Sequence, residues 1–68
     1  MDIYEHYKGN RYKVIGIAKH SETLEELVVY QAMYRDYGIW VRPKDMFFED
    51  VLVNGEMVSR FRKVEDNL

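Results

Sequence analysis

Apolar and polar residues alternate over much of the chain, which predicts strands, because successive side chains of a strand point to opposite faces. The longest alternating run is 11–20, RYKVIGIAKH. One face would carry Tyr12, Val14, Gly16 and Ala18, and the other Lys13, Ile15, Ile17 and Lys19. Both faces are apolar in the middle, as in a long strand of a curved barrel. Gly16 marks the place where this strand would bend or another backbone would approach.

The segment 20–34 supports two interpretations. Thr23 and Glu26 have the spacing of a helix capping box, so one alternative is an α+β fold, a sheet covered by a helix at about 22–33. The run 27–34, LVVYQAMY, is instead rich in β-branched and aromatic residues. We favour a loop with at most one helical turn at 22–26, followed by a strand over about 27–34.

Turn residues divide the next part of the chain into short elements. The run 35–38 predicts a hairpin turn in which Gly38 has a positive φ. A strand over about 39–42 follows and ends at Pro43. Since proline fits the first position of a helix, the run 43–47 predicts one short 3₁₀ turn that docks on the core.

Asn54-Gly55 between two apolar runs predicts a two-residue type I′ hairpin, because both central residues of that turn need a positive φ. Pairing outward from it opposes Val53 to Glu56, Leu52 to Met57, Val51 to Val58, Asp50 to Ser59, Glu49 to Arg60 and Phe48 to Phe61. The elements together predict a mainly β fold, a small, strongly bent, antiparallel five-stranded SH3-like barrel with one short 3₁₀ turn.

The composition indicates a small domain that relies on its apolar core. The chain has 68 residues, 47% of them hydrophobic, with one tryptophan, six tyrosines, three phenylalanines and no cysteine. We expect one domain over 1–68, ordered over about 4–64, with fraying at the last residues and no disulfide. His6 and His20 lie in no dense carboxylate cluster, so neither a metal nor a cofactor is expected. No uncharged run is long enough to cross a membrane.

The charges alternate in sign along the chain and sum to −2. Two basic blocks stand out: Lys8, Arg11 and Lys13, and Arg60, Arg62 and Lys63. Binding of single-stranded nucleic acid is an alternative function that requires these blocks to converge on one face. The negative net charge argues against it, because affinity for phosphates depends on neutralisation by cations.

Several blocks of residues, spread over nearly the whole chain, form a recognisable signature. They are Tyr7-Lys8-Gly9-Asn10 with Tyr12, Val14, Gly16 and Ala18, His20-Ser21-Glu22-Thr23, Glu26-Leu27-Val28-Val29-Tyr30, Trp40-Val41-Arg42-Pro43, Met46-Phe47 and Arg60-Phe61. In these blocks and their order the chain resembles a small bacterial family known as domain of unknown function 1653. The resemblance implies a free-standing cytoplasmic bacterial protein. It implies no activity, substrate or catalytic residue.

Six residues are candidates for a ligand site: His20, Ser21, Glu22, Tyr30, Trp40 and Arg42. If the run 27–34 is extended, the loop before it and the strand after it become neighbours around a groove. Trp40 and Arg42 then face the same way, and an aromatic surface beside a guanidinium suits a peptide, a carboxylate or a stacked base. We therefore interpret the chain as a noncatalytic module that binds a protein, a peptide or a small anionic ligand, as a monomer or weak homodimer.

A small hydrolase or ligand-sensing subunit is the remaining alternative. This alternative uses His20, Glu22 and Arg42, and His20 could act as a general base oriented by Glu22 if the strand continued past residue 20. The chain has no cysteine, and Ser21 and Ser59 are its only serines, so the set of residues for nucleophilic catalysis is poor. This alternative also needs a concave pocket, which a dimer could supply.

Overall fold

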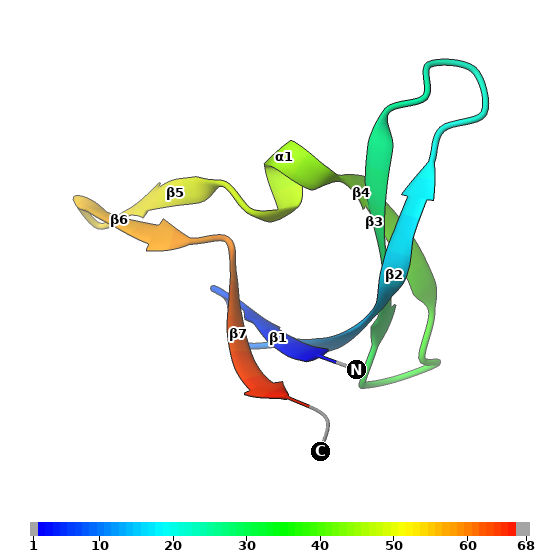
Figure 1. The fold of residues 1–68 in the computed structure, drawn as a ribbon. Helices are drawn as coiled ribbons and strands as arrows, with labels where there is room; N and C mark the ends of the chain where they lie inside the picture. The colour runs from blue at the N-terminus through cyan, green and yellow to red at the C-terminus, as the bar shows by residue number, and fades with distance from the viewer. Residues whose placement is uncertain (1, 67–68) are drawn as a thin grey trace.

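The computed structural model describes residues 2–66 of the chain. In this part the elements follow in the order β1 (Asp2–His6), β2 (Arg11–Lys19), β3 (Glu26–Ala32), β4 (Ile39–Pro43), α1 (Lys44–Phe47), β5 (Asp50–Val53), β6 (Glu56–Ser59) and β7 (Phe61–Asp66). Five of the strands form one antiparallel sheet in the order β4-β3-β2-β1-β7 (Figure 1). β5 and β6 form a separate hairpin. Fraying is expected over residues 65–68, and of these residues 67 and 68 lie outside the described part of the chain.

The five-stranded sheet is strongly bent but open. β4 and β7 are its two edges, and among the described residues no strand pairing joins them. Figure 1 shows the sheet curving so that β1 and β7 lie across from β3 and β4, with α1 between the ends. The expected mainly β, antiparallel, five-stranded architecture is therefore confirmed, whereas closure into a barrel is not.

The segment 20–34, for which the sequence supported both a helix and a strand, contains the strand β3. β3 pairs with β2 on one side and with β4 on the other, so the alternative helix at 22–33 is wrong. Val28, Tyr30 and Ala32 are buried and alternate with half-buried neighbours, a period of two that only a strand satisfies. The helix signal at Thr23 serves a turn instead: its Oγ1 accepts the N–H of Glu25 at 3.2 Å.

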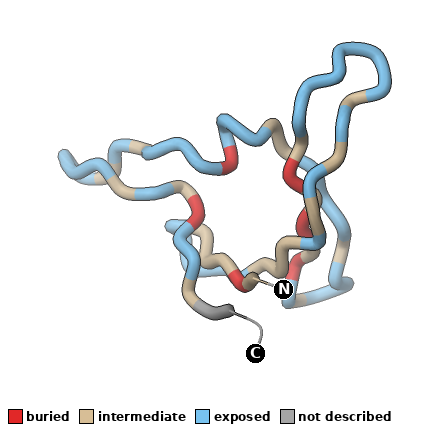
Figure 2. The backbone as a smooth tube through the Cα atoms, in the orientation of Figure 1, coloured by how far each residue is buried: buried red, intermediate tan, exposed pale blue. Residues whose placement is uncertain are grey.

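The core lies on the concave face of the bent sheet. It contains Val28, Tyr30, Phe47 and Phe61, and Tyr4, Tyr12 and Val14 pack against it. Figure 2 shows the buried residues on the inner side of the curved chain. The small core consists largely of aromatic rings, so most of its stabilisation comes from a few large side chains.

A β-bulge in β2 changes the predicted faces of that strand. The register with β3 shifts between Val14 and Gly16, so that Val14 faces Tyr30 but Ile17, rather than Gly16, faces Val28. Because directly opposed residues of an antiparallel pair share a face, the predicted alternation is correct only up to Val14. No atom outside the local chain lies within 4 Å of a Cβ built on Gly16, so the glycine accompanies a bend and not a close backbone approach.

Two local turn predictions need correction. In the turn after β3 the positive φ angles belong to Arg35 and Tyr37, and Gly38 has none. The short element after β4 is one α-helical turn and not a 3₁₀ turn, because the N–H of Phe48 bonds the carbonyl of Lys44, four residues earlier.

The Asn54-Gly55 hairpin has the predicted register from Val53↔Glu56 to Asp50↔Ser59, with φ values of 50° and 83° at the two turn residues. The expected contact of Phe48 with Phe61 is wrong, since the ring stacked on Phe61 is that of Phe47. Beyond the hairpin, the carbonyl of Arg60 accepts the N–H of Tyr7, so the chain leaves β5 and pairs with β1 instead.

Candidate functional site

A hollow on the concave face combines five side chains that the sequence separates widely. Its lining residues are Tyr12, Tyr30, Tyr34, Trp40 and Arg42, and its volume is about 200 Å³. They come from β2, β3, the turn after β3, and β4. Three of the six residues expected at a ligand site, Tyr30, Trp40 and Arg42, therefore meet here.

Trp40 and Arg42 share a face because they are two residues apart in β4. Trp40 lies opposite Tyr30 and Arg42 lies opposite Val28, so both side chains stand on the core side of the sheet. Tyr30 is 5% exposed and forms the buried base of the hollow, whereas Trp40 is 58% exposed and lines its rim. Gly38 gives the indole room, since a Cβ there would lie 3.4 Å from Trp40 Nε1.

The guanidinium of Arg42 is held in place by neutral aromatic groups. Its Nε donates to the hydroxyl of Tyr30 at 3.4 Å, and its central carbon lies 5.8 Å from the ring centroid of Phe61. Of the carboxylates whose side chains the structure describes, none forms an ion pair with Arg42. The half-buried positive charge is therefore available to a ligand.

Two tyrosines form a fixed wall of the hollow. The hydroxyls of Tyr12 and Tyr34 lie 2.9 Å apart and share a hydrogen bond. Burial, the hydrogen bond and the electrostatic effect of Tyr34 raise the pKa of Tyr12 to about 12. Tyr12 is thus neutral near pH 7, and the pair can present hydroxyls to a polar ligand.

A second hollow lies on the other side of Trp40. It is lined by Ala32, Tyr34, Arg35, Asp36 and Trp40 and has a volume of about 390 Å³. It shares Tyr34 and Trp40 with the first hollow. A ligand bound at Arg42 could therefore continue past the indole, which is the arrangement that an extended peptide needs.

The other three candidate residues lie on the turn between β2 and β3, which Figure 1 shows projecting from the sheet. Nδ1 of His20 accepts the backbone N–H groups of Glu22 and Thr23 at 3.1 and 3.4 Å. The strand ends at Lys19, so the contact of His20 with Glu22 involves the backbone and not the carboxylate. His20, Ser21 and Glu22 are not among the residues that line the hollow at Arg42.

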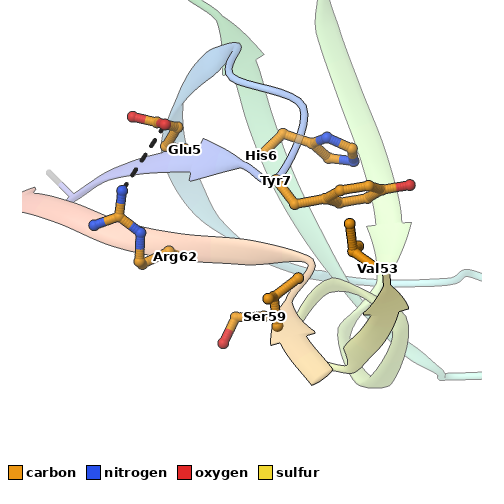
Figure 3. Close-up of a pocket in the computed structure, with 7 residues that line it drawn as sticks. Glu5, His6, Tyr7, Val53, Ser59 and Arg62 are labelled. Atoms are coloured by element: carbon orange, nitrogen blue, oxygen red, sulfur yellow. Dashed lines mark ion pairs between the residues drawn. The ribbon is translucent and has the colours of Figure 1, made fainter. Parts of the chain in front are cut away.

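Sequence reasoning missed a third hollow, of about 470 Å³, between the end of β1 and the β5–β6 hairpin (Figure 3). Its lining residues are Glu5, His6, Tyr7, Val53, Val58, Ser59 and Arg62. Glu5 pairs with Arg11 at 3.2 Å and with Arg62 at 3.8 Å, so the charges at this hollow neutralise one another. The hollow depends on the pairing of β1 with β7, which are distant in sequence, so no local pattern indicated it.

His6 lines this third hollow, and its pKa responds to charged side chains nearby. Its Nδ1 accepts the N–H of Lys8 at 3.2 Å. Burial lowers the pKa of His6, and the positive charges of Arg42, Arg60 and Lys8 lower it further. A neutral imidazole with Nδ1 occupied as an acceptor carries its proton on Nε2.

The two basic blocks lie on strands that are separated by β1, and a carboxylate of β1 stands between them. β1 lies between β2 and β7, and its Glu5 bridges Arg11 of the first block to Arg62 of the second. Among the histidine and acidic side chains that the structure describes, no three cluster as a metal site would need. In the same part of the chain no helix has the length and apolarity to span a bilayer.

Comparison with known proteins gives a family and a structural relative. The family model described as "Protein of unknown function (DUF1653)" matches residues 2–63. A crystal structure of a protein belonging to DUF1653 from Bordetella bronchiseptica is similar to this fold with a TM-score of 0.86. That protein is 32% identical, and the similarity covers 97% of this chain and 87% of the other. None of the curated proteins matches.

Proposed function

The chain belongs to the DUF1653 family of proteins of unknown function, and from the geometry of its site we propose that it is a noncatalytic binding module. Its ligand is a peptide that carries a carboxylate, or a similar small anionic molecule, bound at Trp40 and Arg42. The carrying observation is the half-buried guanidinium of Arg42, which has a neutral hydrogen-bond partner and lies in one hollow with a tryptophan that is 58% exposed.

The chemistry of the hollow selects this class of ligand. A guanidinium with free N–H groups forms two parallel hydrogen bonds with a carboxylate. The indole of Trp40 offers a flat apolar surface beside it, and the hydroxyls of Tyr12 and Tyr34 offer further polar contacts. The adjoining hollow beyond Trp40 has space for the residues that precede the carboxylate.

The proposal includes two expected features, the first derived from the strand pattern of the sequence and the second implied by the family resemblance. One is an SH3-like mode of recognition, in which aromatic side chains on a bent sheet receive an extended peptide. The other is a location in the bacterial cytoplasm. The turn that carries His20, Ser21 and Glu22 lies beyond the Arg42 end of β4, on the side away from the hollow past Trp40. It therefore takes part only where a ligand extends past Arg42, and its role there is to hold the ligand and not to perform catalysis.

Chemical-shift mapping by NMR tests the proposal. The probes are acetyl-Ala-Ala-Phe with a free carboxylate, the same peptide as an amide, and an oligothymidylate. We expect shifts at the indole N–H of Trp40 and the amides around Tyr30 and Arg42, with the amide peptide binding at least about tenfold more weakly. Shifts confined to the hollow around His6 would contradict the location, and stronger, salt-sensitive binding of the oligothymidylate would favour nucleic acid instead.

A further inference from the structure

The free edge of β4 is unusually apolar. Ile39, Trp40 and Val41 are consecutive and are 62%, 58% and 57% exposed. The run 37–41 contains no charged residue, whereas β7, at the opposite edge of the same sheet, carries Arg62, Lys63, Glu65 and Asp66. Because charges on an edge strand prevent pairing with other strands, β7 is protected against such pairing and the exposed run of β4 is not.

The hydrogen-bond pattern shows which backbone groups β4 offers. The N–H of Ala32 donates to the carbonyl of Gly38 at 2.9 Å, which fixes the phase of the β3–β4 ladder. Since bonded and non-bonded pairs alternate along an antiparallel ladder, Trp40 bonds to β3, while Ile39 and Val41 point their N–H and C=O groups outward.

We propose that β4 pairs with β4 of a second copy of this chain, antiparallel, about a two-fold axis at Trp40. In this register Ile39 of one copy faces Val41 of the other. Each of these two pairs then exchanges both of its N–H···O=C bonds, because all the groups involved point outward. Moving the axis to Val41 would bring Ile39 opposite Pro43, which has no N–H to donate.

The side chains on both faces fit this pairing. Ile39 and Val41 lie opposite Gln31 and Val29, so they cluster on the outer face, and each covers the partner's apolar residue. The two Trp40 side chains meet on the concave face as a non-hydrogen-bonded pair. The partner's Trp40 then adds a wall to the hollow at Arg42.

Charges beyond the two ends of the strand favour a second copy over an unrelated peptide. Asp36 lies four residues before Trp40 and Lys44 four residues after it. The two-fold axis therefore brings the turn that carries Asp36 towards the partner's Lys44 at each end of the ladder. Within its own chain Lys44 pairs with Glu26 at 3.3 Å, so Asp36 would join this ion pair as a second carboxylate. A closed two-fold pairing also leaves the charged β7 strands as the outer edges of the combined sheet.

Sedimentation equilibrium of the full chain tests the pairing and needs no ligand, so it is independent of the proposed binding function. We expect the weight-average mass to rise with concentration towards twice that of one chain. Val41→Lys should raise the dissociation constant at least about tenfold, because it places like charges near the axis. Leu52→Lys, on an apolar residue of β5 that is 68% exposed against 57% for Val41, is the matched control and should leave the dissociation constant unchanged. A mass that stays at one chain up to about 1 mM would overturn the proposal.

Cross-linking tests the register. Because the chain has no cysteine, a single introduced cysteine can form a disulfide only between two copies. Trp40→Cys should cross-link readily on mild oxidation, since the Cα atoms of a non-hydrogen-bonded pair lie about 4.5 Å apart. Leu52→Cys, 68% exposed in the wild type and away from the axis, is the control. Equal cross-linking of the two variants would overturn the pairing at Trp40.

Discussion

The rings of Phe47 and Phe61 stack face to face, with centroids 4.1 Å apart and planes 4° from parallel. Phe47 comes from α1 and Phe61 from the start of β7, so this one contact joins the helix to the edge of the sheet. Phe61 also supports Arg42, whose guanidinium lies 5.8 Å from its ring. The stacked pair thus connects the core to the floor of the proposed site.

Replacing Phe47 should destabilise the fold strongly. Phe47→Ala removes a fully buried ring, and we expect the free energy of unfolding to fall by about 3–5 kcal/mol, as measured by chemical denaturation. Phe47→Leu, with a smaller loss of volume, should remain folded. Its free energy of unfolding should lie between those of the wild type and Phe47→Ala. Phe48→Ala is the matched control, because that ring is 49% exposed. Equal losses at the two positions would show that the stacked pair is not the centre of the core.

Replacing Trp40 should leave the fold intact. The side chain is 58% exposed and borders a hollow, so Trp40→Ala should reduce the free energy of unfolding by about 1 kcal/mol or less. A thermal melt of this variant, compared with that of Phe47→Ala, measures the difference. A loss as large as that of Phe47→Ala would show that the indole belongs to the core and not to a ligand site.

Acidification should destabilise the protein through His6. The pKa of His6 is lowered in the folded state by burial and by Arg42, Arg60 and Lys8, so the unfolded chain takes up a proton near pH 6.5 before the folded one does. The free energy of unfolding should therefore fall as the pH drops through about 6.5 and level off below the lowered folded-state pKa. Denaturation of His6→Gln should show a smaller pH dependence than denaturation of the control His20→Gln. An unchanged pH dependence in His6→Gln would contradict this.

Alkaline pH should destabilise the protein through Tyr12. Its pKa is raised to about 12 by burial and by Tyr34, so the stability it contributes is complete below about pH 10 and is lost as the pH rises towards 12. Tyr12→Phe should flatten the fall in unfolding free energy over this range. Tyr37→Phe, which removes a hydroxyl from a side chain that is 59% exposed, is the control and should not. Equal slopes in the two variants would argue against the Tyr12–Tyr34 pair.

Features determined by neighbouring residues could be predicted from the sequence. The Asn54-Gly55 hairpin has its predicted register because the turn itself requires positive φ at both residues. The strand over β3 was predicted because its alternation and β-branched residues outweigh the capping signal at Thr23. For the same reason Trp40 and Arg42 were correctly placed on one face.

Features that depend on distant contacts could not be predicted. The choice of Phe47 over Phe48 as the partner of Phe61 depends on how α1 sits on the sheet, which no local pattern records. The bulge after Val14 reverses the faces of the rest of β2, although the sequence alternation continues unbroken. Likewise, the Tyr12–Tyr34 contact joins residues 22 apart in sequence, so the wall that these two side chains form could not be predicted from the sequence.

The most direct test of the central claim measures peptide affinity through the fluorescence of Trp40, the single tryptophan of the chain. Acetyl-Ala-Ala-Phe with a free carboxylate is titrated into the wild type, Arg42→Gln and Arg62→Gln, which remove equal charge from the site and from the hollow around His6. We expect Arg42→Gln to weaken binding at least about tenfold and Arg62→Gln to weaken it less than about twofold. Equal weakening by the two variants, or no binding to the wild type, would contradict the account.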